Sequence, residues 1–137
     1  MPHLTSTEIA GRIEELYGGP LADLHAHAQH QPPGMLSALL GMHDALALAE
    51  RSIDVHRDYV ARFVHPGRPI GRHEVAHLLD GSRRLAEAVA ARDVQATSLL
   101  AVLQSLTRAP APAASPPSAS PSAPALPISA QSAVHGR

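Results

Sequence analysis

The feature that most constrains the fold is an apolar repeat with a period of 3.5 residues, present in two segments on either side of a short loop. In the first segment, residues at spacings of three and four are Leu39, Met42, Leu46, Ala49, Ile53, His56, Val60 and Phe63. In the second they are Val75, Leu78, Ser82, Leu85, Val89, Arg92, Ala96, Leu99, Leu103 and Leu106. A repeat of this kind forms one stripe along an α-helix. The sequence therefore predicts two long helices.

The loop between the two segments, HPGRP at 65–69, contains two prolines and a glycine that end a helix. Two long helices joined by so short a loop must fold back antiparallel. Two shorter helices are expected before them. Thr5 stands three residues before Glu8, which is the spacing of a capping box, and Gly18-Gly19 can end that first helix. A second short helix follows Pro20.

We therefore predict an all-α fold, a long antiparallel helical hairpin with two short N-terminal helices in a three- or four-helix bundle. Pairing Phe63 with Val75 sets a register in which His56 faces Ser82 and can bond to it. Arg92 then has no polar residue directly opposite, and Glu50, one position from the seam, could reach it.

The composition changes after Arg108. The segment 109–137 consists mainly of proline, alanine and serine, and it has almost no charge and few large apolar side chains. Such a segment cannot bury enough surface to offset the entropy lost on ordering. We therefore divide the chain into a helical domain at 1–108 and a disordered tail at 109–137.

Charge and composition argue against several classes of function. The net charge is -1, so no nucleic acid or membrane partner is expected, and there is no cysteine for a disulfide or a cysteine-based zinc site. No apolar run is long enough to span a membrane, and no signal peptide is evident. We expect a cytoplasmic location. The bias toward alanine, arginine and proline is typical of bacterial proteins encoded at high GC content.

One motif points to chemistry. His73-Glu74-Val75-Ala76-His77 matches the His-Glu-x-x-His pattern of zinc peptidases, in which two histidines one turn apart bind zinc. His73 and His77 would then be the metal ligands, and Glu74 would be the catalytic general base acting on a zinc-bound water. A zinc-dependent hydrolase is therefore the alternative interpretation of this chain.

Three features weaken that alternative. A catalytic zinc needs a third protein ligand, but Asp80 and Arg83 stand where the long form of the pattern has glycine and histidine. No segment is a convincing strand. His73 and His77 also lie opposite the apolar stripe, in line with Asp80, so they are expected on a solvated face that could hold a divalent ion only loosely. A second group of histidines, His25, His27 and His30, is poorly spaced for a single ion.

We therefore expect a non-enzymatic helical interaction or regulatory module that binds a protein partner or forms a homo-oligomer through the heptad face. The short N-terminal helices are expected to leave part of that face exposed, either between Leu36 and Leu46 or beyond Leu99. No cofactor is expected, and zinc is required only under the hydrolase alternative.

Overall fold

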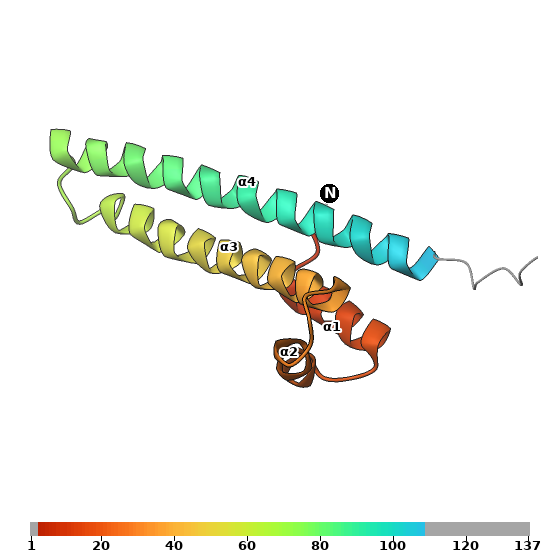
Figure 1. The fold of residues 1–137 in the computed structure, drawn as a ribbon. Coiled ribbons are helices and arrows are strands. Elements are labelled where there is room, and N and C mark those ends of the chain that lie inside the picture. The colour runs from red at the N-terminus through yellow and green to blue at the C-terminus, as the bar shows by residue number, and fades with distance from the viewer. Residues whose placement is uncertain (1–2, 109–137) are drawn as a thin grey trace, which may run out of the picture.

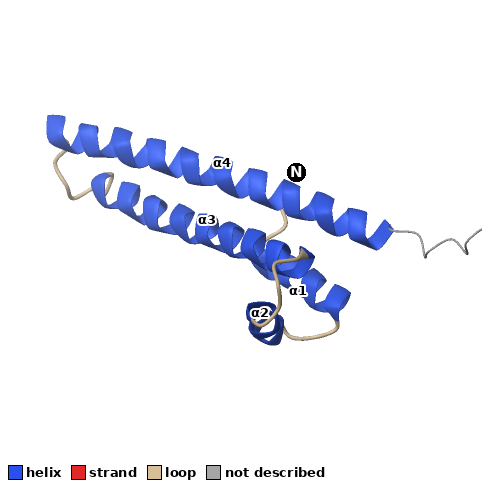
Figure 2. Cartoon of the chain, in the orientation of Figure 1, coloured by secondary structure: helices blue, strands red, loops and turns tan. Residues whose placement is uncertain are grey.

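The computed structural model describes residues 3–108, which form four α-helices and contain no strand. They are α1 (Ser6–Tyr17), α2 (Leu21–Gln29), α3 (Met35–Phe63) and α4 (Arg72–Arg108). Helices α3 and α4 form a long antiparallel hairpin, and α1 and α2 lie against the end of it that holds the start of α3 (Figures 1 and 2). The predicted all-α hairpin with two short N-terminal helices is therefore confirmed. The predicted tail, 109–137, lies outside the described residues.

The short helix α1 begins as its sequence predicts. The backbone N–H of Thr5 donates to Oε2 of Glu8 at 2.7 Å, and the backbone N–H of Glu8 donates to Oγ1 of Thr5 at 3.3 Å. The two residues thus form the predicted capping box. Gly18 ends the helix in the left-handed conformation, with φ 74°, which glycine adopts without strain.

The core lies in the half of the molecule where all four helices meet. Its buried side chains are Ile9 and Ile13 of α1, Leu24 of α2, Leu39, Leu40 and Leu46 of α3, and Ala96, Leu99 and Leu103 of α4. Helices α1 and α2 therefore cover the part of the heptad stripe that was predicted to stay exposed, and that prediction is wrong. Two isoleucines from α1 and one leucine from α2 pack against the apolar residues of α3 and α4 there and shield them from solvent.

The other half of the hairpin, toward the loop, is only two helices deep. Gly81 is buried there, and a Cβ atom at this position would lie 2.8 Å from Cδ1 of Tyr59 and 3.1 Å from Cγ2 of Val60. Gly81, rather than Ser82, therefore faces α3 at this level. Ser82 is exposed and makes no side-chain hydrogen bond within residues 3–108, so the predicted bond between His56 and Ser82 is absent. The prediction that Ser82 faces α3 is therefore wrong, because α4 is rotated so that Gly81 takes that place.

The predicted pairing of Arg92 with Glu50 is also wrong. The guanidinium of Arg92 lies 2.8 Å from Oδ1 of Asp93, its neighbour in the chain. Glu50 instead accepts hydrogen bonds from the first residue of α1, with the backbone N–H of Ser6 at 2.8 Å and the Ser6 hydroxyl on the other carboxylate oxygen. Glu50 thus fastens the start of α1 to α3.

None of the described helices has an apolar stretch long enough to cross a membrane.

Candidate functional site

The His-Glu-x-x-His motif lies in the first two turns of α4, beside the loop of the hairpin. The side chain of Glu74 in this motif makes a hydrogen bond to the backbone at the start of α4. One carboxylate oxygen, Oε2, accepts a hydrogen bond from the backbone N–H of Gly71 at 2.9 Å. Hydrogen bonding from its own backbone N–H and from that of Gly71 lowers the pKa of Glu74 below its ordinary value. The Glu74 side chain therefore caps the N-terminus of α4. A lowered pKa also makes its carboxylate a weaker general base.

The second histidine of the motif packs against α3. The Nδ1 atom of His77 lies 2.8 Å from the hydroxyl of Tyr59, and its ring stacks on that of Phe63 with a centroid distance of 5.1 Å. His77 is half-buried, whereas His73 is exposed. The expectation that both histidines lie on a solvated face is therefore correct for His73 and wrong for His77.

The two histidines of the motif are close enough to share one ligand. Their Nε2 atoms lie 2.9 Å apart, so one ring donates a hydrogen bond to the other. The Tyr59 oxygen can accept the Nδ1 proton of His77, and the Nε2 of His77 then accepts the hydrogen bond from His73. An ion at this pair would have to replace the hydrogen bond between the two rings.

A third protein ligand for that pair is missing from the part of the chain that the structure describes. Asp80, the acid considered on the same face, is held by Arg83 at 3.1 Å and Arg84 at 3.0 Å, and the hydrogen bond from Arg83 is the main cause that lowers its pKa. No group of three metal-binding side chains includes His73 or His77 within residues 3–108. The assignment of these two histidines to zinc and of Glu74 to catalysis stays a prediction that this geometry does not favour.

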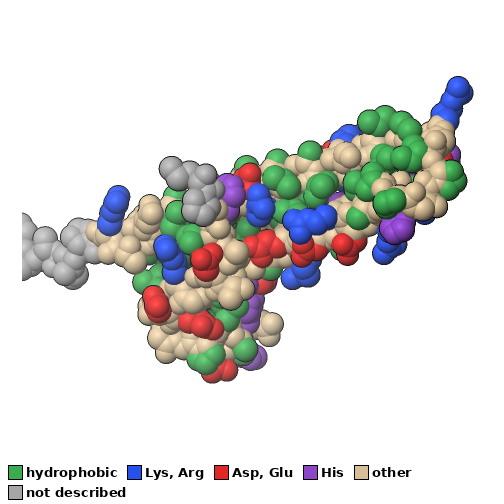
Figure 3. Space-filling view, turned by 180° about the vertical axis from the view of Figure 1, so that it is seen from behind, with side chains coloured by type: hydrophobic (Ala, Val, Ile, Leu, Met, Phe, Trp, Pro, Cys, Tyr) green, Lys and Arg blue, Asp and Glu red, His purple; other side chains and the backbone are tan. Residues whose placement is uncertain are grey.

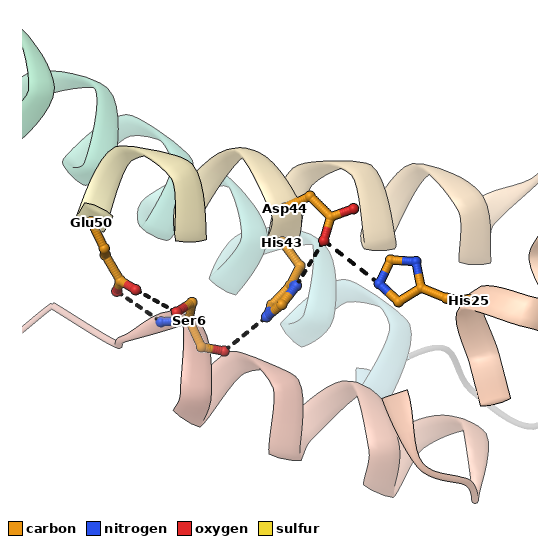
Figure 4. A network of polar contacts seen from close by, with 5 residues as sticks. All are labelled: Ser6, His25, His43, Asp44 and Glu50. Atoms are coloured by element: carbon orange, nitrogen blue, oxygen red, sulfur yellow. Dashed lines mark hydrogen bonds and ion pairs between the residues drawn. The ribbon is translucent and has the colours of Figure 1, made fainter. Parts of the chain in front are cut away.

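Three metal-binding side chains do gather elsewhere, between α2 and α3. His25 comes from α2, and His43 and Asp44 come from α3, as Figure 4 shows. Oδ1 of Asp44 lies 3.4 Å from Nδ1 of His43 and 3.6 Å from Nε2 of His25. The sequence groups His25 with its neighbours His27 and His30, but the structure instead brings it to residues eighteen and nineteen positions away. No spacing signal could have found this cluster, because the packing of α2 on α3 creates it.

Apolar side chains are exposed at the loop end of the hairpin, and hydrophobic side chains gather there in the space-filling view (Figure 3). The large ones, with their exposed fractions, are Val55 at 63%, Val64 at 53%, Ile70 at 59%, Val75 at 45% and Leu79 at 69%. A group of exposed aliphatic side chains often marks a surface that is buried by a binding partner, so this surface is a candidate interface.

Helix α4 carries a second stripe of small and apolar residues, separate from the seam with α3. We call it the outer stripe. All its members are exposed, and they are Val75, Leu79, Ser82, Ala86, Ala90, Val94, Thr97 and Ala101. At about 100° per residue they fall within an arc of roughly 120°. The outer stripe thus resembles the face of a helix that packs against another helix.

No family model matches the chain, and no curated protein or solved structure matches it. Function is therefore inferred from the geometry of the molecule. Two features offer a basis for that inference, the outer stripe of α4 and the cluster of His25, His43 and Asp44.

Proposed function

We propose that this chain is a non-enzymatic helical interaction module that self-associates, with α4 of one copy packed antiparallel against α4 of a second copy. The observation that carries the proposal is that the members of the outer stripe are all exposed and uncharged along most of α4. From Val75 to Ala101 its members are separated by four, three, four, four, four, three and four residues. This series reads the same in both directions about position 88, so a two-fold axis there matches the stripe to itself.

The side chains that this axis would pair are complementary in size. Each large aliphatic side chain of the stripe meets a smaller one of the second copy, and the pairs are Val75 with Ala101, Leu79 with Thr97, Val94 with Ser82 and Ala86 with Ala90. Alternation of larger and smaller side chains lets two helices approach closely and still fill the space between them. An isologous interface of this kind is the commonest form of homodimer.

Two charged residues, Arg83 and Asp93, fall in the same arc of α4 as the stripe. The same axis brings Arg83 of one copy to the level of Asp93 of the other. Opposite charges therefore lie at the same level on both sides of the axis, and this arrangement favours the antiparallel orientation. In a parallel pair, Arg83 would lie level with a second Arg83.

A competing surface lies next to the outer stripe, and Arg83 borders both. It is a groove between α3 and α4, lined by Ala49, Ser52 and His56 and, on α4, by Arg84, Glu87 and Ala91. The groove is lined on α4 by the charged residues Arg83, Arg84 and Glu87, whereas the members of the outer stripe are uncharged. We therefore favour the outer stripe as the interface.

Sedimentation equilibrium of the full chain tests the proposal, with two matched variants. Ala90→Glu places a charge in the centre of the outer stripe, whereas Ala91→Glu places the same charge one residue along, in the groove. We expect a dimer for the wild type and for Ala91→Glu, and a monomer for Ala90→Glu, because a buried unpaired carboxylate is costly. Circular dichroism would check that both variants remain helical.

A wild-type chain that is monomeric at high micromolar concentration would contradict the proposal. A dimer that Ala91→Glu dissociates while Ala90→Glu does not would also contradict it, and would assign the interface to the groove.

A further inference from the structure

We propose that His25, His43 and Asp44 form a binding site for a divalent transition-metal ion of the Zn²⁺ type, which links α2 to α3. Oδ1 of Asp44 lies 3.4 Å from Nδ1 of His43 and 3.6 Å from Nε2 of His25, and all three ligand atoms lie within 4.8 Å of one another. Tetrahedral zinc, with nitrogen and oxygen ligands at about 2.0–2.2 Å, places neighbouring ligand atoms about 3.4 Å apart. Two of the three distances are therefore close to those of a zinc site.

The hydrogen bonding of His43 favours a positive charge at this point. Its Nε2 lies 3.1 Å from the backbone carbonyl oxygen of Ser6, which can only accept, so Nε2 carries a proton. In the neutral ring, Nδ1 then has a lone pair, and that lone pair faces the carboxylate oxygen of Asp44 at 3.4 Å. Two acceptors facing each other repel unless a cation lies between them. A metal ion between them would make both of them ligands.

The contact of His43 with Ser6 is also the second-shell arrangement that metal sites use. A histidine ligand usually donates its other ring N–H to a carbonyl or carboxylate, which fixes the ring and raises its basicity. Ser6 is itself fixed, because Glu50 accepts hydrogen bonds from its backbone N–H, at 2.8 Å, and from its hydroxyl (Figure 4). His43 is only 8% exposed, so packing holds its ring in place as well.

The site is open on one side. The side chain of Asp44 is 61% exposed and that of His25 is 34% exposed. An ion could therefore enter from solvent, and a water molecule could supply a fourth ligand. Two imidazoles and one carboxylate favour Zn²⁺, Co²⁺ or Ni²⁺ over Mg²⁺, which prefers oxygen ligands alone.

This inference does not depend on the proposed function. Within residues 3–108 the three ligands lie on α2 and α3, away from the outer stripe of α4, so metal binding and self-association are expected to vary independently. The site also differs from the His73 and His77 pair, which offers two ligands.

Isothermal titration calorimetry with zinc chloride tests the site on the full, untagged chain after chelator treatment. We expect one zinc ion per chain, and no binding in the same experiment with magnesium chloride. His25→Ala and Asp44→Asn should each weaken zinc binding by more than about tenfold. His27→Ala, on the same helix as His25, and the double variant His73→Ala/His77→Ala should leave the affinity unchanged.

Nitrogen NMR of the wild-type histidine rings gives a second readout that needs no variant to fold. Zinc should shift the Nδ1 signal of His43, while its Nε2 keeps its proton on the Ser6 carbonyl. The proposal is overturned if zinc does not bind, if binding is lost with His73→Ala/His77→Ala and kept with His25→Ala, or if zinc leaves the His43 ring signals unchanged.

Discussion

The hydroxyl of Tyr59 lies 2.8 Å from Nδ1 of His77, and this contact joins the two long helices beside their loop. It turns a histidine of an apparent zinc motif into part of the packing between α3 and α4. The His77 ring completes the arrangement by stacking on Phe63, with an angle of 12° between the ring planes. The loop end of the hairpin is thus held by aromatic and polar contacts instead of a large aliphatic core.

Tyr59→Phe should destabilise the chain by about 0.5–1.5 kcal/mol, because it removes one hydrogen bond and leaves the ring packing unchanged. The free energy of unfolding, measured by urea titration, checks this. Tyr17→Phe is the matched control, since Tyr17 is 38% exposed and its hydroxyl makes no hydrogen bond within the described residues. Equal effects of the two substitutions would mean that the bond to His77 contributes nothing to stability.

Alanine substitutions at two helical glycines should have opposite effects. In Gly81→Ala the new Cβ would lie 2.8 Å from the Tyr59 ring, so the ring must move and its bond to His77 is strained. At Gly41 of α3 nothing lies within 4 Å of the same atom. Gly41→Ala should therefore stabilise the chain by up to about 1 kcal/mol through helix propensity, and Gly81→Ala should destabilise it. Thermal unfolding of both variants checks the sign, and a stabilising Gly81→Ala would refute the packing described at Tyr59.

Acid should weaken the start of α1. Hydrogen bonds from the backbone N–H and then the hydroxyl of Thr5 hold the pKa of Glu8 below its ordinary value of 4.5. A lowered pKa in the folded state means that Glu8 adds stability above its unfolded pKa, and that this stability is lost as pH falls through the folded pKa. Glu8→Gln should therefore be less stable than the wild type at neutral pH, and the difference should shrink in acid.

Urea unfolding of the wild type and Glu8→Gln at about pH 7 and about pH 3 measures this difference. Glu15→Gln is the control on the same helix, because the side chain of Glu15 makes no hydrogen bond or ion pair among the described residues. A difference between Glu8→Gln and the wild type that stays constant with pH would show that folding does not lower the pKa of Glu8, and would contradict the role given to the capping box.

Alanine substitutions at two leucines of α4 should affect stability and dimerisation separately. Leu99 is fully buried in the core, whereas Leu79 is 69% exposed on the outer stripe. Leu99→Ala should cost about 2–5 kcal/mol of stability by leaving a cavity. Leu79→Ala should change the stability of the monomer by less than about 0.5 kcal/mol and weaken the dimer. Unfolding at low protein concentration and sedimentation at high concentration check the two effects, and a large loss of monomer stability in Leu79→Ala would count against an outward-facing Leu79.

The helices could be predicted from the sequence because each has strong local signals. The capping box of Thr5 and Glu8 and the glycine at 18 define α1, and the 3.5-residue repeat defines α3 and α4. These signals depend only on residues within a turn or two of one another. The antiparallel hairpin followed from the length of its loop.

The contacts between helices could not be predicted in the same way. A heptad pattern leaves the rotation of a helix about its axis uncertain by about one residue. In the structure α4 is rotated so that Gly81 is buried and Ser82 is exposed. That rotation turns His77 toward Tyr59. The grouping of His25 with Asp44 depends on how α2 packs on α3, which no local pattern specifies.

A distance between spin labels tests whether two copies of α4 pack antiparallel about position 88. The chain has no cysteine, so Ser105→Cys carries a single label at an exposed site off the outer stripe. At about 1.5 Å per residue, an antiparallel dimer centred at 88 predicts about 50 Å between the two labelled positions. Double electron–electron resonance that gives this distance would support the antiparallel dimer, whereas a distance near roughly 20 Å, about two helix diameters as in a parallel pair, would contradict it.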